Sequence, residues 1–501
     1  MEQRKSNKLK AIVADYPPKN RRVPIIQGTA KGRLWAWYLL VAYAFAFTLG
    51  VYVASILFGV SGFEVTPYVN ALYLGIVGFG IVALFVPIYL IEGNIEFPRK
   101  ALALGSVVAG WALLSAAIGL LRDNPLIYIF ADVAFILMGV AGYMLTRMGM
   151  VYVTIDKYSI NRMFLIAWVV VGPAIIAALG LLPAPLLERP EVLILPSLLL
   201  ILVAVFAYCL LVGDLRKAIA LFLPLLAGAP FVNRAMIITI VIVVVITLAV
   251  MAKQGRLRAI LKASYLLALL SILFYLTGWL LADDTVSRLD ETFLGYRLEK
   301  TQAVFAGEGV DVSQDIAIVQ RLYELTTVAD SLADSPINLV FGMGAGATID
   351  LTYFNTLLPT EESASLLGFQ EVHNIHLLPA ATAYRYGLLG LGFLGVLSFW
   401  FIREAFRARS SSTFVAAMAG IGLIIYSIPA SQFVFREPLL WFSLAWVVNA
   451  ERSRRNEMLS SFGFSQRIAM MPRRVRQKHE SVFDVPQRDD GRVGEEGRPQ
   501  E

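Results

Sequence analysis

Residues 234–253 read RAMIITIVIVVVITLAVMAK, and their only charged members, Arg234 and Lys253, stand at the two ends. A helix of about 20 apolar residues is long enough to cross the hydrocarbon core of a bilayer. Such stretches recur along the chain, which has 501 residues, 57% of them hydrophobic and only 16% charged. Soluble proteins carry about 25% charged residues. The composition therefore excludes a string of soluble domains and indicates a membrane protein with many spans.

The apolar stretches predict the fold class, an all-α polytopic membrane protein with about twelve transmembrane helices. Nine of them fall within 34–282 and three within 373–449. The piece at 218–230 is the weakest, because so short a helix hardly spans a bilayer and also fits a tilted or re-entrant half-helix. The predicted spans are 34–58, 68–91, 101–121, 125–145, 163–182, 191–213, 218–230, 235–252, 260–282, 377–402, 412–428 and 433–449.

Lys and Arg are distributed unevenly between alternate loops. With a cytoplasmic N-terminus and twelve crossings, 34 of the 43 Lys and Arg residues fall in cytoplasmic segments, as the positive-inside rule requires. The basic arm, 1–33, and the tail, 450–501, hold the largest shares, and the composition of the tail predicts disorder. We expect both termini in the cytoplasm and attribute the net charge of +6 to topology, not to nucleic-acid binding.

The segment 283–372 is the one large polar stretch between predicted spans, and the alternation of charge assigns it to the outer side. It carries 15 acidic and four basic residues. Its part 316–332 has apolar residues at helical spacing and predicts an amphipathic helix. We therefore expect a partly helical extracytoplasmic loop domain between spans nine and ten. The apolar positions of the predicted helix are Ile318, Leu322, Leu325, Val328 and Leu332.

A glycine cluster, FGMGAGA at 341–347, follows that helix. Gly342, Gly344 and Gly346 permit a close backbone approach and positive φ angles. One interpretation is a tight turn beneath the active face. The other is that the backbone amides contribute to binding an anionic head group. A nucleotide-binding loop is excluded, because such loops belong to cytoplasmic strand–helix units.

Two of the three histidines, His373 and His376, stand together where the loop re-enters the membrane, and His479 lies in the tail. Residues at i and i+3 share one face of a helix. The pair could pack or cap, or transfer a proton, since imidazole titrates near neutral pH. No third ligand at metal spacing accompanies the pair, so we predict neither a metal site nor a cofactor.

Four arginines gather toward the predicted outer side: Arg234 and Arg436 at span ends, Arg321 on the loop helix, and Arg385 inside the tenth span, beyond the histidines. An arginine near hydrocarbon is normally paired or functional, although each alone could reach the interface along its own stem. Together they suit a substrate that carries phosphates, because guanidinium groups bind phosphate oxygens in a bidentate manner.

Over residues 230–450 the chain resembles the O-antigen polymerase/ligase superfamily of bacterial polysaccharide assembly. The resemblance consists of Arg234 at the start of a span, a large loop in which Arg321 leads a helix before the glycine-rich turn, and His373–Asn374 before a span that begins with Gly-x-x-Gly at 387–390.

The spacing departs from that family in one place. The family has ten residues between its histidine and the first glycine, whereas thirteen separate His373 from Gly387. His376 keeps the interval of ten but is followed by Leu377. Three residues are nearly one helical turn, so either histidine can point into the same site. Asn374 favours His373, and the choice stays open.

The resemblance implies a metal-independent, inverting glycosyltransferase that moves glycan from undecaprenyl diphosphate to an acceptor hydroxyl at the outer face of the bacterial inner membrane. His373 or His376 would act on the acceptor proton. The arginines and Asn374 would bind the diphosphate or the substrate. We expect a polymerase of O-antigen or exopolysaccharide. The alternatives are a ligase that delivers finished glycan to a lipid core or protein, and a transporter.

A transporter is the least favoured of the three, because the first nine predicted spans hold few ionisable residues, Asp132 being the clearest. The expected partners are the undecaprenyl-diphosphate-linked oligosaccharide, the acceptor glycan, membrane lipid, and a chain-length regulator or flippase. No nucleic acid is expected among them.

Overall fold

The computed structural model describes eight main parts of the chain. These parts are 99–149, 196–228, 234–269, 316–350, 371–373, 375–408, 411–429 and 434–449, together with residue 272. All lie in the first of two compact units, Met1–Val447, or at the start of the second, Val448–Glu501. The predicted spans 34–58, 68–91 and 163–182, the arm, the tail and Asn374 lie outside the described residues.

Four helices of the described residues are long and apolar enough to cross a membrane. They are α5 (Arg99–Leu121), α6 (Leu126–Gly149), α12 (Arg234–Lys253) and α19 (Leu378–Arg407). Three shorter apolar helices accompany them: α10 (Pro196–Val212), α20 (Ser411–Ser427) and Pro438–Asn449. The sequence prediction of apolar helices in these regions is confirmed, and the protein is a helical membrane protein.

Helix α12 shows why the bilayer environment decides the local structure. Its run of Ile and Val is a poor helix former in water. In hydrocarbon, however, every backbone polar group must find its partner within the segment, and a helix achieves this. The hydroxyls of Thr239 and Thr247 donate to the carbonyls of Ala235 and Val243, each four residues earlier. The buried side-chain hydroxyls are thereby satisfied as well.

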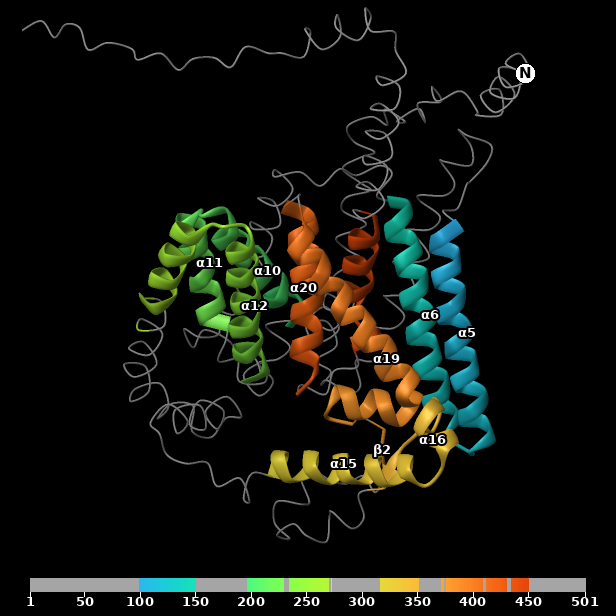
Figure 1. Cartoon of the computed structure of the whole chain (residues 1–501). Helices are drawn as coiled ribbons and strands as arrows, with labels where there is room; N and C mark the ends of the chain where they lie inside the picture. The colour runs from blue at the N-terminus through green and yellow to red at the C-terminus, as the bar shows by residue number, and fades with distance from the viewer. Residues whose placement is uncertain are drawn as a thin grey trace, which may run out of the picture. The chain divides into compact units, whose positions relative to one another are not determined.

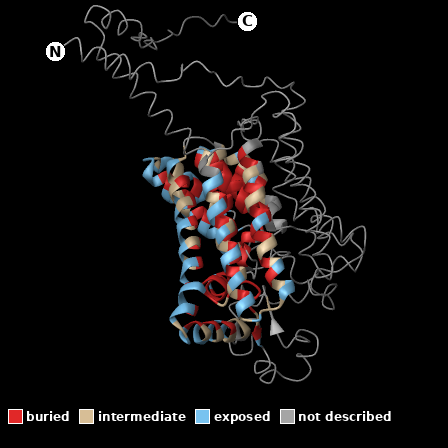
Figure 2. Ribbon diagram, turned by 90° about the vertical axis from the view of Figure 1, so that its right-hand side faces the viewer, coloured by how far each residue is buried: buried red, intermediate tan, exposed pale blue. Residues whose placement is uncertain are grey.

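The described helices carry large apolar residues whose side chains are exposed; Figure 2 colours the exposed residues of the ribbon pale blue. Val107 on α5, Phe130 on α6, Val241 on α12 and Phe399 on α19 are all more than half exposed. Soluble proteins rarely leave so much apolar surface in water. Helix α10 is instead buried along most of its length and packs against α11 (Leu215–Gly228), α12 and α20 (Figure 1).

The weak span predicted at 218–230 is the short helix α11. Its 14 residues extend about 21 Å at 1.5 Å per residue, less than the roughly 30 Å of a hydrocarbon core. A half-helix packed against α10 fits this length. The count of twelve spans stays a prediction.

The predicted continuous span 377–402 is wrong in one respect, because α19 is interrupted at Gly387 (φ 62°, ψ −159°). A Cβ atom there would overlap the backbone of Val340 and Phe341. The part 378–386 lies across the end of the bundle beside α15 (Ile316–Ala333), and only 388–407 continues into it (Figure 1). Those last 20 residues are about 30 Å long, enough to cross a bilayer.

The loop elements gather at this end of the bundle. Helix α15 is followed by α16 (Pro336–Phe341), which Ser335 caps by accepting a hydrogen bond from the backbone of Ile337. Strands β1 (Ile349–Asp350) and β2 (Glu371–Val372) form one short antiparallel pair. The amphipathic helix predicted at 316–332 is confirmed as a helix. Of its apolar positions, Val328 and Leu332 are buried, whereas Leu322 and Leu325 are exposed.

Candidate functional site

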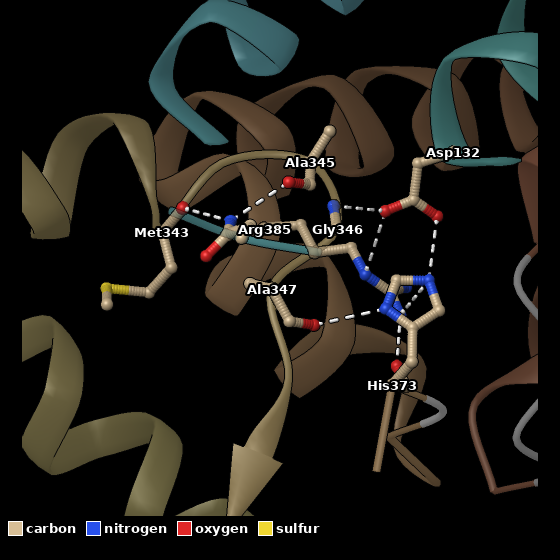
Figure 3. A network of polar contacts seen from close by, with 8 residues as sticks. Asp132, Met343, Ala345, Gly346, Ala347, His373 and Arg385 are labelled. Atoms are coloured by element: carbon tan, nitrogen blue, oxygen red, sulfur yellow. Dashed lines mark hydrogen bonds and ion pairs between the residues drawn. The ribbon is translucent and has the colours of Figure 1, made fainter. Parts of the chain in front are cut away.

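A buried carboxylate, Asp132 on α6, joins three segments at the end of the bundle (Figure 3). Its Oδ2 accepts a hydrogen bond from the backbone nitrogen of Gly346 at 2.9 Å and lies 3.4 Å from Nε of Arg385. Its Oδ1 lies 3.2 Å from Nε2 of His373. A buried charge is tolerated only when it is paired and hydrogen-bonded. Asp132 therefore links α6, the glycine turn and α19.

His373 has contacts at both ring nitrogens and on one face of its ring. Its Nδ1 lies 3.2 Å from the carbonyl oxygen of Ala347, and its Nε2 faces Asp132. Its ring stacks on Tyr128, with 4.5 Å between centroids and 5° between planes. The guanidinium of Arg385 donates to the carbonyl of His373. Both ring nitrogens of His373 thus face protein oxygen atoms, and the side chain links α6 to the turn that contains Ala347.

His376 has a different environment. Its Nδ1 lies 2.6 Å from Oε1 of Glu324 on α15, and its backbone nitrogen donates to Oε2 at 2.7 Å. Glu324 is buried and also accepts a hydrogen bond from Gln320 at 3.0 Å. The His376 side chain is 32% exposed, against 18% for His373. Among the described residues its Nε2 has no hydrogen-bond partner, so this nitrogen is available to a reacting group.

Arg321 lies three residues before Glu324 on the same helix, so both side chains stand on one face. Its Nη2 donates to the carbonyl of Pro429, just beyond α20, at 3.2 Å. Its Nε is buried and has no hydrogen-bond partner within the described parts of the chain. The start of α19 meets the same turn, where the nitrogen of Leu378 donates to Ile428. Arg321 and His376 therefore flank one turn at the end of α20.

The other predicted cations have different positions. Arg385 is buried against Asp132 and His373 and does not present an open guanidinium for a diphosphate. Arg234 begins α12, and Arg436 ends the short helix η2 (Val434–Arg436). The side chains of these two arginines, and the whole of Asn374, lie outside what the structure describes, so their predicted roles stay predictions.

The glycine cluster forms a tight turn whose backbone amides are occupied. The amide nitrogens of Gly342, Gly344 and Gly346 donate to Asn338 O, Arg385 O and Asp132 Oδ2 at 2.7, 3.1 and 2.9 Å. The two intervening amides donate to the carbonyls of Tyr384 and Ser115. Every amide from 342 to 346 thus has a protein acceptor, which favours the interpretation as a turn over an anion cradle.

Two carboxylates that organise the site were not among the predicted site residues. Asp132 is 241 positions from His373 along the chain. Its one signal was its place within a predicted span, where an ionisable residue is usually functional. Glu324 was one of 15 acidic residues in 283–372. Its signal was the helical spacing to Arg321.

Within the described residues, no group of three or more His, Cys, Asp and Glu side chains is placed to hold a metal ion. That the site works without a metal stays a prediction.

No protein-family model matches the chain, and no curated protein matches its sequence.

Proposed function

We propose that the protein is a membrane glycosyltransferase that polymerises a polysaccharide, using a glycan on a lipid diphosphate as donor. The observation that carries the proposal is the group formed by Arg321, Glu324 and His376. It combines a histidine held by a buried carboxylate with an arginine whose Nε lacks a partner in the described residues. The sequence resemblance supplies the reaction class, and this group supplies the parts that such a reaction needs.

The chemistry follows from the geometry of the histidine. Glu324 holds the proton of Nδ1, so the lone pair of Nε2 can take the proton of the acceptor hydroxyl. The hydroxyl oxygen then attacks the anomeric carbon and forms the new glycosidic bond. The bond from that carbon to the diphosphate oxygen breaks, and the lipid diphosphate leaves with the electron pair. Arg321 stabilises the charge that develops on the leaving group.

The geometry supports His376 over His373 as the base. The Nε2 of His376 has no hydrogen-bond partner among the residues that the structure describes, whereas both ring nitrogens of His373 face oxygen atoms of the protein. His376 also keeps the interval of ten residues to Gly387. The earlier preference for His373 rested on Asn374 alone.

The place of the group in the fold suits a lipid-linked donor. It lies where the loop helix α15 meets the ends of α19 and α20, which belong to the apolar bundle. The distribution of Lys and Arg supports a cytoplasmic location for both termini and an outer location for this end. We accordingly propose the outer face of the bacterial inner membrane.

The test compares lipid-linked and exported glycans, on gels, from a deletion strain complemented with single variants. Arg321→Ala and His376→Ala should each abolish long chains and leave single repeat units on the lipid at a normal protein level. Leu325→Ala, on the exposed side of the same helix, is the matched control and should restore full chain lengths. His373→Ala should retain the polymerisation reaction when the glycan formed is compared with the amount of that variant present in the cells.

Normal chain lengths in both Arg321→Ala and His376→Ala would refute the proposed site. The strain without the protein separates the alternative functions. Accumulated long lipid-linked chains would identify a ligase, and the absence of any outer-face intermediate would identify a transporter. EDTA should leave the activity of the purified protein unchanged, and loss of activity that added metal restores would overturn the metal-independent mechanism.

A further inference from the structure

The short helix α16 has an inverted distribution of polarity. Its one polar side chain, Asn338, is buried, where it accepts from the guanidinium of Arg122 and donates to the carbonyl of Ser331 at 3.0 Å. Its four large apolar side chains are all 37–63% exposed. These are Ile337, Leu339, Val340 and Phe341. In water the opposite arrangement is favoured, because apolar groups leave the solvent and polar groups stay in it.

The exposed apolar surface continues from α16 onto the membrane-spanning helices at both of its sides. On one side, Gly387 packs against the backbone of Val340 and Phe341, and the next two residues, Leu388 and Leu389, are exposed at the start of the long part of α19. On the other side, Arg122 ties α16 to the turn between α5 and α6. The exposed apolar side chains bordering that turn are Leu120, Leu121, Leu126 and Ile127.

A change to acidic side chains marks where this surface stops. Asp330 and Asp334, on the last turn of α15 and just beyond it, are exposed. Asp334 stands three residues before Ile337, the first large apolar residue of α16, and Asp330 stands seven residues before it. A polar-to-apolar boundary over so short a distance is typical of a segment that meets the surface of a bilayer.

We infer that α16 lies in the bilayer and that its exposed apolar face, Ile337, Leu339, Val340 and Phe341, contacts lipid acyl chains. The partner of this surface is lipid, because the surface is continuous with the lipid-facing sides of α5, α6 and α19. The turn from α16 through 341–347 carries Ala345 and Gly346 against α5 and α6. Seating α16 in lipid therefore holds the glycine turn and the loop helix α15 at the level of the membrane surface. This inference does not depend on the proposed reaction.

The experiment measures the collision rates of single spin labels with oxygen, which concentrates in hydrocarbon, and with a water-soluble nickel chelate. The full chain is reconstituted in phospholipid vesicles with its only cysteine replaced, Cys209→Ala. The labels are attached to Ile337→Cys and Val340→Cys on α16. The lipid reference is Val107→Cys on α5, which is 70% exposed, and the water reference is Asp330→Cys on α15.

At Ile337, Val340 and the lipid reference Val107 we expect the oxygen collision rate to exceed the nickel rate, and at Asp330 we expect the reverse ratio. A nickel rate equal to that at Asp330 would place α16 in water and overturn the inference. Low rates of both reagents would mean that protein, from this chain or from another, covers the face, and this result would overturn the inference as well. Growth or glycan length plays no part in the readout, so a failure here is distinct from a failure of the proposed function.

Discussion

At the residue scale, two buried carboxylates each lie beside a histidine, and their hydrogen-bond partners differ. Asp132 contacts His373, Arg385 and the amide of Gly346, so its carboxylate is fully engaged by groups of the protein itself. Within the described residues, Glu324 forms hydrogen bonds with His376 and Gln320 only, and the Nε2 of His376 has no partner there. We assign a structural role to Asp132 and a positioning role to Glu324.

Replacing Asp132 should lower stability. In Asp132→Ala the guanidinium of Arg385 stays buried without its carboxylate, and an uncompensated buried charge costs about 3–5 kcal/mol. Asp132→Asn can still accept from Gly346 and should lose less. The measurement is thermal unfolding of the detergent-solubilised protein, with the exposed Asp330→Ala as the control. A melting temperature of Asp132→Ala equal to that of the control would contradict the structural role.

Replacing Glu324 should lower turnover. Glu324→Gln preserves the size of the side chain and an oxygen for the backbone nitrogen of His376. It removes the negative charge that stabilises the protonated imidazole. We expect kcat to fall roughly 10²–10⁴-fold, the usual contribution of a general base, with little change in KM. The assay is polymerisation of purified lipid-linked repeat units.

Unchanged kcat in Glu324→Gln would remove this carboxylate from the mechanism. An equal loss of activity and melting temperature would instead indicate a purely structural residue. The unfolding measurement is therefore made on the same preparation.

At the scale of elements, the loop is attached to the bundle by backbone contacts that have no room for side chains. The turn 342–347 packs its backbone against α5, α6 and the break in α19. Gly344, at φ 86°, lies so close that a Cβ atom would overlap the backbone of Gly119. The sequence motif FGMGAGA is thus explained by packing.

The chain offers a matched pair for testing this packing. Gly213 has nearly the same φ, 85°, but nothing lies within 4 Å of where its Cβ would be. Both Gly213→Ala and Gly344→Ala bear the strain of a left-handed backbone, about 1–2 kcal/mol. Gly344→Ala adds the overlap with α5. We expect a clearly larger drop in melting temperature for Gly344→Ala, and equal drops would show that the turn is not tightly packed.

At the scale of the whole molecule, apolar helices and segregated charge define how the chain sits in a membrane. Exposed apolar side chains cover α5, α6, α12 and α19, while 34 of the 43 Lys and Arg residues fall in alternate segments of the predicted topology. The first observation identifies a membrane protein. The second predicts which ends of the spans are cytoplasmic.

Labelling of single cysteines with a membrane-impermeant maleimide tests that topology in the Cys209→Ala background. Asp330→Cys in the loop should react in intact cells whose outer membrane is permeable to the reagent. Ser460→Cys in the tail should react only after the inner membrane is opened. Labelling of Ser460→Cys in intact cells would reverse the proposed orientation. The amount of each cysteine variant in the membrane fraction serves as the control.

The sequence by itself determined the apolar helices and the loop helix at 316–332, and it singled out the histidines and Arg321 as candidates. These are local properties, since hydropathy and helical spacing are read from about 20 consecutive residues. It could not show that α19 breaks at Gly387, because that break depends on the backbone of α16 that packs there.

Only the tertiary structure decided which carboxylate faces which histidine. Asp132 meets His373 across 241 residues, and Glu324 meets His376 across 52. Such pairs form because a buried charge needs a partner close to it in space. That partner can lie anywhere in the chain, so its identity depends on the folded arrangement and not on sequence neighbours. For the same reason, the two histidines, three residues apart in the sequence, differ in the structure: both ring nitrogens of His373 face protein oxygen atoms, whereas the Nε2 of His376 has no hydrogen-bond partner in the described residues.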